Sequence, residues 1–122
     1  KEDLKVELSA LIRRQIERDR RRGFPVEFST EGEQIQQLMR DLVGLLGEVG
    51  EFANILKKVE LGRTNPRYVA PSLADAQSDL EEELADTAIY LFRLSEILKV
   101  DLEEAILTKI KANDQRYKKL EG

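Results

Sequence analysis

Apolar side chains recur every three or four residues along most of this chain, which is the period of an amphipathic α-helix. The first such stretch predicts a helix from about Glu2 to Arg22 that ends at Gly23-Phe24-Pro25. Its polar end is a short basic run at residues 18–22, which contains four arginines and Asp19. The apolar positions of this helix are Leu4, Leu8, Leu11, Ile12 and Ile16.

A second, longer helix is predicted to begin after Thr30, which forms a capping box with Glu33. Its apolar positions continue at helical spacing to about Glu60. Gly62 and Pro66 are expected to end it, since both residues disfavour a helix interior.

Two further helices follow a predicted loop at residues 61–71, which contains Gly, Thr, Asn and two prolines. The third is expected to run from Ser72 to about Lys99. The fourth begins at the capping pattern of Asp101 with Glu104 and ends near Lys118. Four amphipathic helices predict an all-α fold, a four-helix bundle formed by a single domain over residues 1–122.

Composition excludes several classes of function. The 122 residues include no histidine and no cysteine, so zinc, haem and iron–sulfur sites and histidine-based catalysis lack their ligands and bases. A metal here must be held by oxygen, which favours Mg²⁺, Mn²⁺ or Ca²⁺. The net charge of −4 argues against nucleic-acid binding. A polar amino terminus and short apolar runs predict no signal peptide, no membrane contact and a cytoplasmic location.

Two pairs of acids border apolar stripes. Glu48 and Glu51 lie three residues apart on the second helix, and Glu83 and Asp86 repeat that spacing on the third. Four carboxylates gathered between two helices would need protons, basic partners or a divalent cation, and a Mg²⁺ site explains them best. The alternative is that they are acids on solvated helix faces, which arise by chance in a chain with 24 acidic residues.

Two other patterns have both functional and structural interpretations. Gly44, Gly47 and Gly50 leave part of the second helix without Cβ atoms, so this part can accept a closely packed helix or a flat ligand. On the fourth helix a cation, an amide and a phenol at four-residue spacing suit phosphate and sugar oxygens. The alternative is an ordinary helix with a basic carboxyl end. The residues concerned are Lys109, Asn113, Arg116 and Tyr117.

Three motifs in this order resemble the MazG-like nucleotide pyrophosphohydrolases, a branch of the all-α NTP pyrophosphatases that also include the dCTP pyrophosphatases. The resemblance covers about residues 42–117. The motifs are Gly47-Glu48-Val49-Gly50-Glu51-Phe52, Glu83-Leu84-Ala85-Asp86-Thr87-Ala88-Ile89-Tyr90-Leu91 and Lys109-x-x-x-Asn113-x-x-Arg116-Tyr117.

The resemblance implies a Mg²⁺-dependent enzyme, with Mn²⁺ as an alternative ion, that converts a nucleoside triphosphate to the monophosphate and pyrophosphate. It assigns metal binding to Glu48, Glu51, Glu83 and Asp86. Among these, Glu51 is the residue predicted to activate the attacking water. It also implies a homodimer or homotetramer and a role in removing noncanonical or surplus nucleotides. The resemblance assigns triphosphate binding to Lys109, Asn113 and Tyr117. Arg116 and Lys58 are added as substrate-binding residues because their charges could meet phosphate, although solvated helix charges are the alternative.

The chain departs from the family pattern at the base-binding positions. Lys58 stands where a base-stacking tryptophan of the dCTP-directed relatives would fall, and the chain has no tryptophan. Predicted loops hold three aromatic residues that could stack on a base or anchor their loops. If the site lies between subunits, Gln15 or Arg18 could complete it. The three aromatic residues are Phe24, Phe28 and Tyr68.

Two other functions compete with this prediction. A noncatalytic helical module could bind a partner or a nucleotide and use the same acids in ion pairs. A di-iron carboxylate bundle needs Glu-x-x-His motifs, which a chain without histidine cannot supply. Pyrophosphate release separates the enzyme from the binding module.

Overall fold

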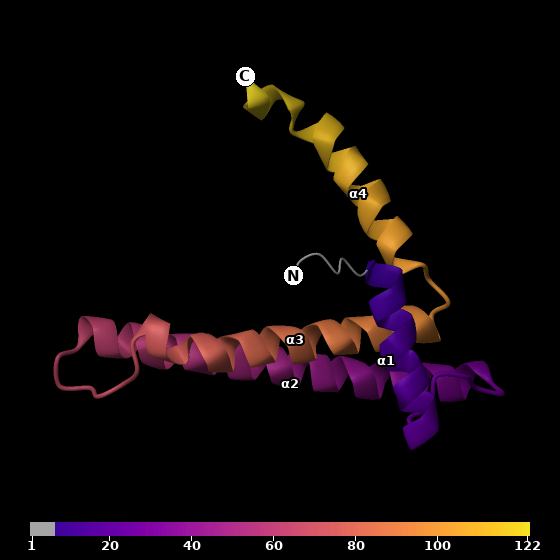
Figure 1. Ribbon diagram of the computed structural model, residues 1–122, viewed down its shortest axis with the longest axis horizontal. Coiled ribbons are helices and arrows are strands. Elements are labelled where there is room, and N and C mark those ends of the chain that lie inside the picture. The colour runs from indigo at the N-terminus through magenta and orange to yellow at the C-terminus, as the bar shows by residue number, and fades with distance from the viewer. Residues whose placement is uncertain (1–6) are drawn as a thin grey trace, which may run out of the picture.

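Four α-helices account for most of residues 7–122, the part of the chain that the computed structural model describes (Figure 1). No strand occurs in this part, so the predicted all-α class is confirmed. The elements are α1 (Leu8–Arg22), α2 (Glu31–Thr64), α3 (Leu73–Ile97), α4 (Leu102–Arg116) and a 3₁₀ turn, η1 (Lys118–Glu121).

Side-chain caps set the starts of α2, α3 and α4. Thr30, Ser72 and Asp101 each accept a hydrogen bond from the backbone N–H three residues later, at 3.1, 3.2 and 3.0 Å. Each cap satisfies an N–H that the helix itself leaves unpaired, which is worth about 1 kcal/mol. The predicted starts of these three helices are therefore confirmed.

The helix ends differ from the predictions by a few residues. Helix α2 continues to Thr64, four residues past the predicted end at Glu60. Gly62 does not end the helix; a Cβ there would lie 2.9 Å from the Cβ of Ala70, so the glycine lets the α2–α3 connection pack on the last turn.

Helices α3 and α4 end at Ile97 and Arg116, each two residues earlier than predicted. Lys99 adopts a positive φ of 60°, which a helix cannot continue through. Helix α1 begins at Leu8; the earlier part of that predicted helix, including Glu2 and Leu4, lies outside the described residues.

The predicted four-helix bundle does not close within one chain. Helices α2 and α3 form a long antiparallel hairpin, α1 crosses one end of it, and α4 packs against α1 and points away from the hairpin (Figure 1). Periodicity shows that a helix has an apolar face, but it does not say which partner covers that face. On α4 the apolar residues Ile106, Leu107 and Ile110 are 41–50% exposed.

The hydrophobic core lies where α1 crosses the hairpin. Ile12, Ile16, Val26 and Ile97 are its buried members. Half-buried apolar side chains surround them, namely Leu8, Phe28, Leu38, Phe92 and Leu102. This core is small for a chain of this length, because much of α2 and α4 is left uncovered. Over the described range no helix offers an apolar stretch suited to crossing a lipid bilayer.

Candidate metal and nucleotide site

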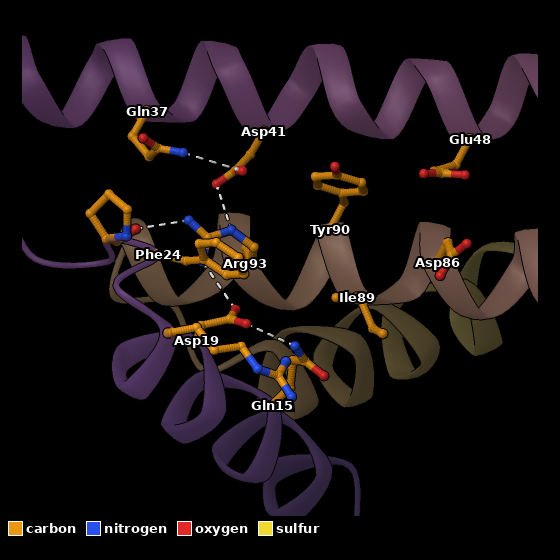
Figure 2. A pocket seen from close by; sticks show the side chains of 12 residues that line it. Gln15, Asp19, Phe24, Gln37, Asp41, Glu48, Asp86, Ile89, Tyr90 and Arg93 are labelled. Carbon is orange, nitrogen blue, oxygen red and sulfur yellow. Dashed lines mark hydrogen bonds and ion pairs between the residues drawn. The ribbon is translucent and has the colours of Figure 1, made fainter.

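The α2–α3 hairpin gathers three of the four predicted acids. Glu83 and Asp86 lie one turn apart on α3 and face Glu48 on α2. One carboxylate oxygen from each of the three residues lies within 4.8 Å of the others. Figure 2 shows Glu48 and Asp86 directed into the space between the two helices. Carboxylates brought this close repel one another unless a proton or a cation lies between them.

Among the three acids of this cluster, Glu83 lies in the environment that most disfavours a negative charge. Its Oε1 atom is shielded from solvent and finds no hydrogen-bond donor within residues 7–122. Hydrogen bonding with the Glu48 carboxyl, followed by the loss of solvent and the proximity of Glu51, raises the pKa of Glu83 to about 7. The neighbouring carboxyls of Glu48 and Glu51 therefore favour the protonated form of Glu83.

The donor set of the cluster fits a hard divalent cation. All three residues offer carboxylate oxygens, and around one Mg²⁺ octahedral bonds of about 2.1 Å place neighbouring ligands about 3–4 Å apart. The buried Oε1 of Glu83, which has no donor among the described residues, is an oxygen that a cation would satisfy. Glu51 is exposed and lies outside the three-oxygen cluster, although it is near enough to raise the pKa of Glu83.

The raised pKa of Glu83 predicts that metal binding releases a proton. We expect the affinity for Mg²⁺ or Mn²⁺ to rise between about pH 6 and pH 8, because the cation no longer competes with that proton. The stability of the metal-free protein changes with pH in the opposite direction to its metal affinity. A carboxyl whose pKa is raised from 4.5 to about 7 by folding makes the folded state less stable as pH rises through that range.

Calorimetric titration at both ends of this pH range, in buffers of different ionisation enthalpy, measures the affinity and the proton release together. Glu83→Gln is expected to remove the proton release. Equal affinity at both pH values in the unmodified protein would contradict the raised pKa of Glu83.

A cavity of about 410 Å³ begins at the acid cluster and extends between α1, α2 and α3 (Figure 2). Glu48 and Asp86 line one end of it, and Tyr90 stands between them and the other end. Its volume is within the range of small-molecule sites. The cavity therefore offers space for a ligand that touches the acids with one of its ends.

A buried ion network, which the sequence analysis missed, forms the other end of the cavity. The Arg93 guanidinium donates from Nη1 to Asp19 on α1 and from Nε to Asp41 on α2, both at 3.0 Å, and from Nη2 to the Pro25 carbonyl at 2.8 Å. The side chains of all three charged residues are at most 8% exposed. The position of Arg93 in the sequence could have indicated this network. Arg93 lies on the same α3 stripe as Ile97, where a charge needs a buried partner.

Close packing between α2 and α3 depends on Gly44. A Cβ at this position would lie 2.4–2.6 Å from the ring and hydroxyl of Tyr90. Gly47 and Gly50 have no such neighbours within 4 Å. Of the two uses predicted for these glycines, close approach of a neighbouring helix is therefore observed at Gly44, where it seats Tyr90 beside the cavity.

Gly44→Ala and Gly47→Ala are expected to have different effects. Gly47→Ala should raise the free energy of unfolding by about 0.5–1 kcal/mol, because alanine is the better helix former. Gly44→Ala should be less stable than Gly47→Ala by about 1–3 kcal/mol, because its methyl group displaces Tyr90. Urea denaturation of both variants measures the difference, and equal stabilisation would contradict the packing argument.

Helix α4 does not reach the cavity within one chain (Figure 1). Lys109 and Asn113 belong to α4, which points away from the hairpin, and Tyr117 is its carboxyl cap. The Arg116 guanidinium stacks over the Tyr117 ring at 5.2 Å. Lys58 is exposed on α2, ten residues and about 15 Å along the helix from Glu48. The predicted substrate-binding residues are thus not assembled with the acids by this fold alone.

The remaining candidates divide between the cavity and the core. Gln15 and Phe24 line the cavity, and Phe24 is 52% exposed. Phe28 packs against the core, so it anchors its loop. Tyr68 lies in the α2–α3 connection, and Arg18 donates to the Arg14 carbonyl rather than into the cavity.

Comparison with known proteins finds a matching family and several similar proteins. Residues 36–120 match the family described as the MazG nucleotide pyrophosphohydrolase domain. Over 98 residues the chain is 37% identical to human dCTP pyrophosphatase 1 and 36% identical to the rat and mouse proteins of that name. These alignments cover 79% of the chain but only 56% of each relative, so the chain spans little more than half of their length.

Proposed function

Because the chain belongs to the MazG nucleotide pyrophosphohydrolase family, we propose that it hydrolyses a nucleoside triphosphate to the monophosphate and pyrophosphate in the presence of Mg²⁺. Mn²⁺ is the alternative ion. The observation that carries this proposal is the cluster of Glu48, Glu83 and Asp86, two of which, Glu48 and Asp86, line one end of the cavity. In the proposed complex the triphosphate would lie at the acids and the nucleoside beyond them.

The proposed roles follow from the chemistry of each side chain. Glu48, Glu83 and Asp86 would hold the ion. When bound, Mg²⁺ offsets the charge of the phosphate oxygens and makes the phosphorus easier to attack. Glu51 is exposed beside the cluster, where its carboxylate can accept a proton from the attacking water.

The nucleoside would occupy the cavity past Tyr90, with the ring of Phe24 available for stacking on the base. The mammalian relatives are named for dCTP, so deoxynucleoside triphosphates are the first substrates to test. Removal of surplus or noncanonical nucleotides is the role that we propose, and the cytoplasm, where free nucleotides are abundant, is the proposed location.

We further propose that two chains associate and that α4 of one completes the site of the other. An apolar stripe runs along the side of α2 that its own chain leaves exposed. Burying such a stripe stabilises a dimer, and a tetramer could form by pairing of dimers. In that assembly Lys109, Asn113, Tyr117 and Arg116 of a second subunit would contact the triphosphate. The stripe consists of Ile35, Met39, Leu42, Val43, Leu46, Val49 and Leu56.

Two variants with defects on different helices test the shared site. Asp86→Asn and Asn113→Ala are each expected to lose turnover when expressed alone. Co-expression should restore about a quarter of the wild-type activity, because half of the dimers are mixed and each mixed dimer holds one intact site. Light scattering gives the oligomeric state. An active monomer, or no recovery in mixed dimers, would exclude the shared site.

The reaction itself is tested by measuring pyrophosphate and monophosphate released from a panel of canonical and modified NTPs and dNTPs. Release that requires Mg²⁺ and stops with EDTA supports the proposed enzyme, and the rank order identifies the preferred base. If folded protein turns over no nucleotide with Mg²⁺ or Mn²⁺, the noncatalytic binding module becomes the better explanation.

A further inference from the structure

Five side chains form a continuous hydrogen-bonded series at the end of the cavity that lies away from the acids (Figure 2). Arg93 stands at its centre and binds Asp19 on one side and Asp41 on the other. Each carboxylate uses its second oxygen to accept from a glutamine one helical turn earlier. Gln15 Nε2 donates to Asp19 at 2.9 Å, and Gln37 Nε2 donates to Asp41 at 3.4 Å.

This series determines which way each glutamine amide points. An ionised carboxylate can only accept hydrogen bonds, so the NH₂ end of each amide must face its aspartate. The carbonyl oxygen of each amide then points away from the aspartate. Both glutamines line the cavity, where a ligand that donates a hydrogen bond could reach these oxygens.

The centre of the series is held rigidly. Burial lowers the pKa of Arg93, but the bonds to Asp41 and Asp19 outweigh that effect and raise it, so the guanidinium stays charged. Its third bond, to the Pro25 carbonyl, ties the α1–α2 connection to the same group. The two aspartates therefore cannot turn without breaking a buried ion pair, and the amides are oriented before a ligand arrives.

We propose that Gln15 and Gln37, positioned by Asp19, Arg93 and Asp41, select a nucleobase that carries an exocyclic amino group over one that carries a carbonyl at the same place. Cytosine and adenine meet this condition, whereas uracil and hypoxanthine do not. The inference rests on the proposed function, because it takes the triphosphate to lie at Glu48 and Asp86.

The chemical reason is the pairing of donors with acceptors. An amino group donates to the fixed carbonyl oxygens, whereas a base carbonyl would face them as a second acceptor and leave both groups without a partner. Because the carboxylates pin the NH₂ ends, the amides cannot rotate to suit the carbonyl base. Discrimination therefore comes from the rigidity of the series as well as from the two glutamines.

The test compares dCTP with dUTP and dATP with dITP, two pairs that exchange an amino group for a carbonyl. We measure kcat/KM with Mg²⁺ and, separately, binding by calorimetry with Ca²⁺. The amino-bearing member of at least one pair is expected to be preferred by about 10-fold or more, the factor that corresponds to one hydrogen bond. Gln15→Leu and Gln37→Leu should each reduce that ratio, whereas Gln36→Leu, an exposed neighbour outside the cavity, should not.

Asp41→Asn tests positioning apart from damage to the fold. Asparagine at this place can donate as well as accept, so the Gln37 amide becomes free to turn over. The preference for the amino-bearing nucleotide should fall. The kcat/KM and the affinity for the carbonyl-bearing nucleotide should be unchanged or raised. A merely structural defect would lower the values for both nucleotides and would leave their ratio unchanged.

The outcomes separate this inference from the proposed function. Hydrolysis of both members of each pair at equal rates overturns the inference and keeps the enzyme. Selective binding without hydrolysis keeps the inference and overturns the enzyme. If the folded protein neither binds nor hydrolyses any of the four nucleotides, both are overturned.

Discussion

Asp86→Asn and Glu48→Gln are each expected to lower Mg²⁺-dependent turnover by at least about 100-fold while the protein stays folded. Both residues contribute an oxygen to the cluster with Glu83, and an amide in either place removes one negative charge from the metal site. A neutral amide oxygen is a weaker ligand for Mg²⁺ than a carboxylate.

The fold should survive these changes because the three acids repel one another without a cation. Removing one charge relieves that repulsion. In Glu48→Gln the pKa of Glu83 should also move back toward 4.5, because the Glu48 carboxyl is the largest cause of its rise. Thermal unfolding of the metal-free variants is therefore expected at the same temperature as the unmodified protein or at a higher one.

The measurement is initial rate against Mg²⁺ concentration, with circular dichroism as a check on helical content. Glu82→Gln is the matched control, because this acid lies on the same helix but is exposed and outside the cluster. It should keep full activity. Full activity in Asp86→Asn or Glu48→Gln would remove the metal-cluster argument.

Arg93→Met is expected to cost the fold about 3–5 kcal/mol, the largest stability change that we predict. Methionine replaces most of the side-chain volume but leaves Asp19 and Asp41 buried without their counter-ion, and it frees the Pro25 carbonyl. The cost comes chiefly from the unpaired charges rather than from the loss of an attraction.

Urea denaturation of the metal-free protein gives the change in unfolding free energy, provided that the slope with urea is unchanged. Arg63→Met is the control: its ion pair with Glu60 is exposed, so its loss should leave the unfolding free energy nearly unchanged. A triple variant with Asp19→Leu, Asp41→Leu and Arg93→Met should recover much of the stability. Similar costs for Arg93→Met and Arg63→Met would show that the buried network contributes little.

Local signals were sufficient for most of the secondary structure. The capping residues Thr30, Ser72 and Asp101 begin α2, α3 and α4 as predicted, because a cap acts through a hydrogen bond only three residues away. The helix ends were predicted less well. Gly62 was expected to end α2, yet it lies within the last turn, since its effect depends on Ala70 across the connection.

Part of the candidate site could also be predicted from the sequence, because it depends on residues close together in the chain. Spacing of three residues placed Glu83 and Asp86 on one side of a helix, and an antiparallel hairpin was enough to bring Glu48 to them. The roles of these acids, and that of exposed Glu51, remain predictions. Spacing could not distinguish the members of the cluster from a neighbour, because that depends on how α2 and α3 are rotated toward each other.

By itself the sequence determined the all-α class, the starts of three helices and the acids available to a metal, all of which depend on residues within one or two turns. Only the tertiary structure decided the partners of Arg93, the seating of Tyr90 against Gly44 and the direction of α4. Each of these joins residues far apart in the chain. The energy of burying a charge, or of covering an apolar face, depends on what the fold places opposite it.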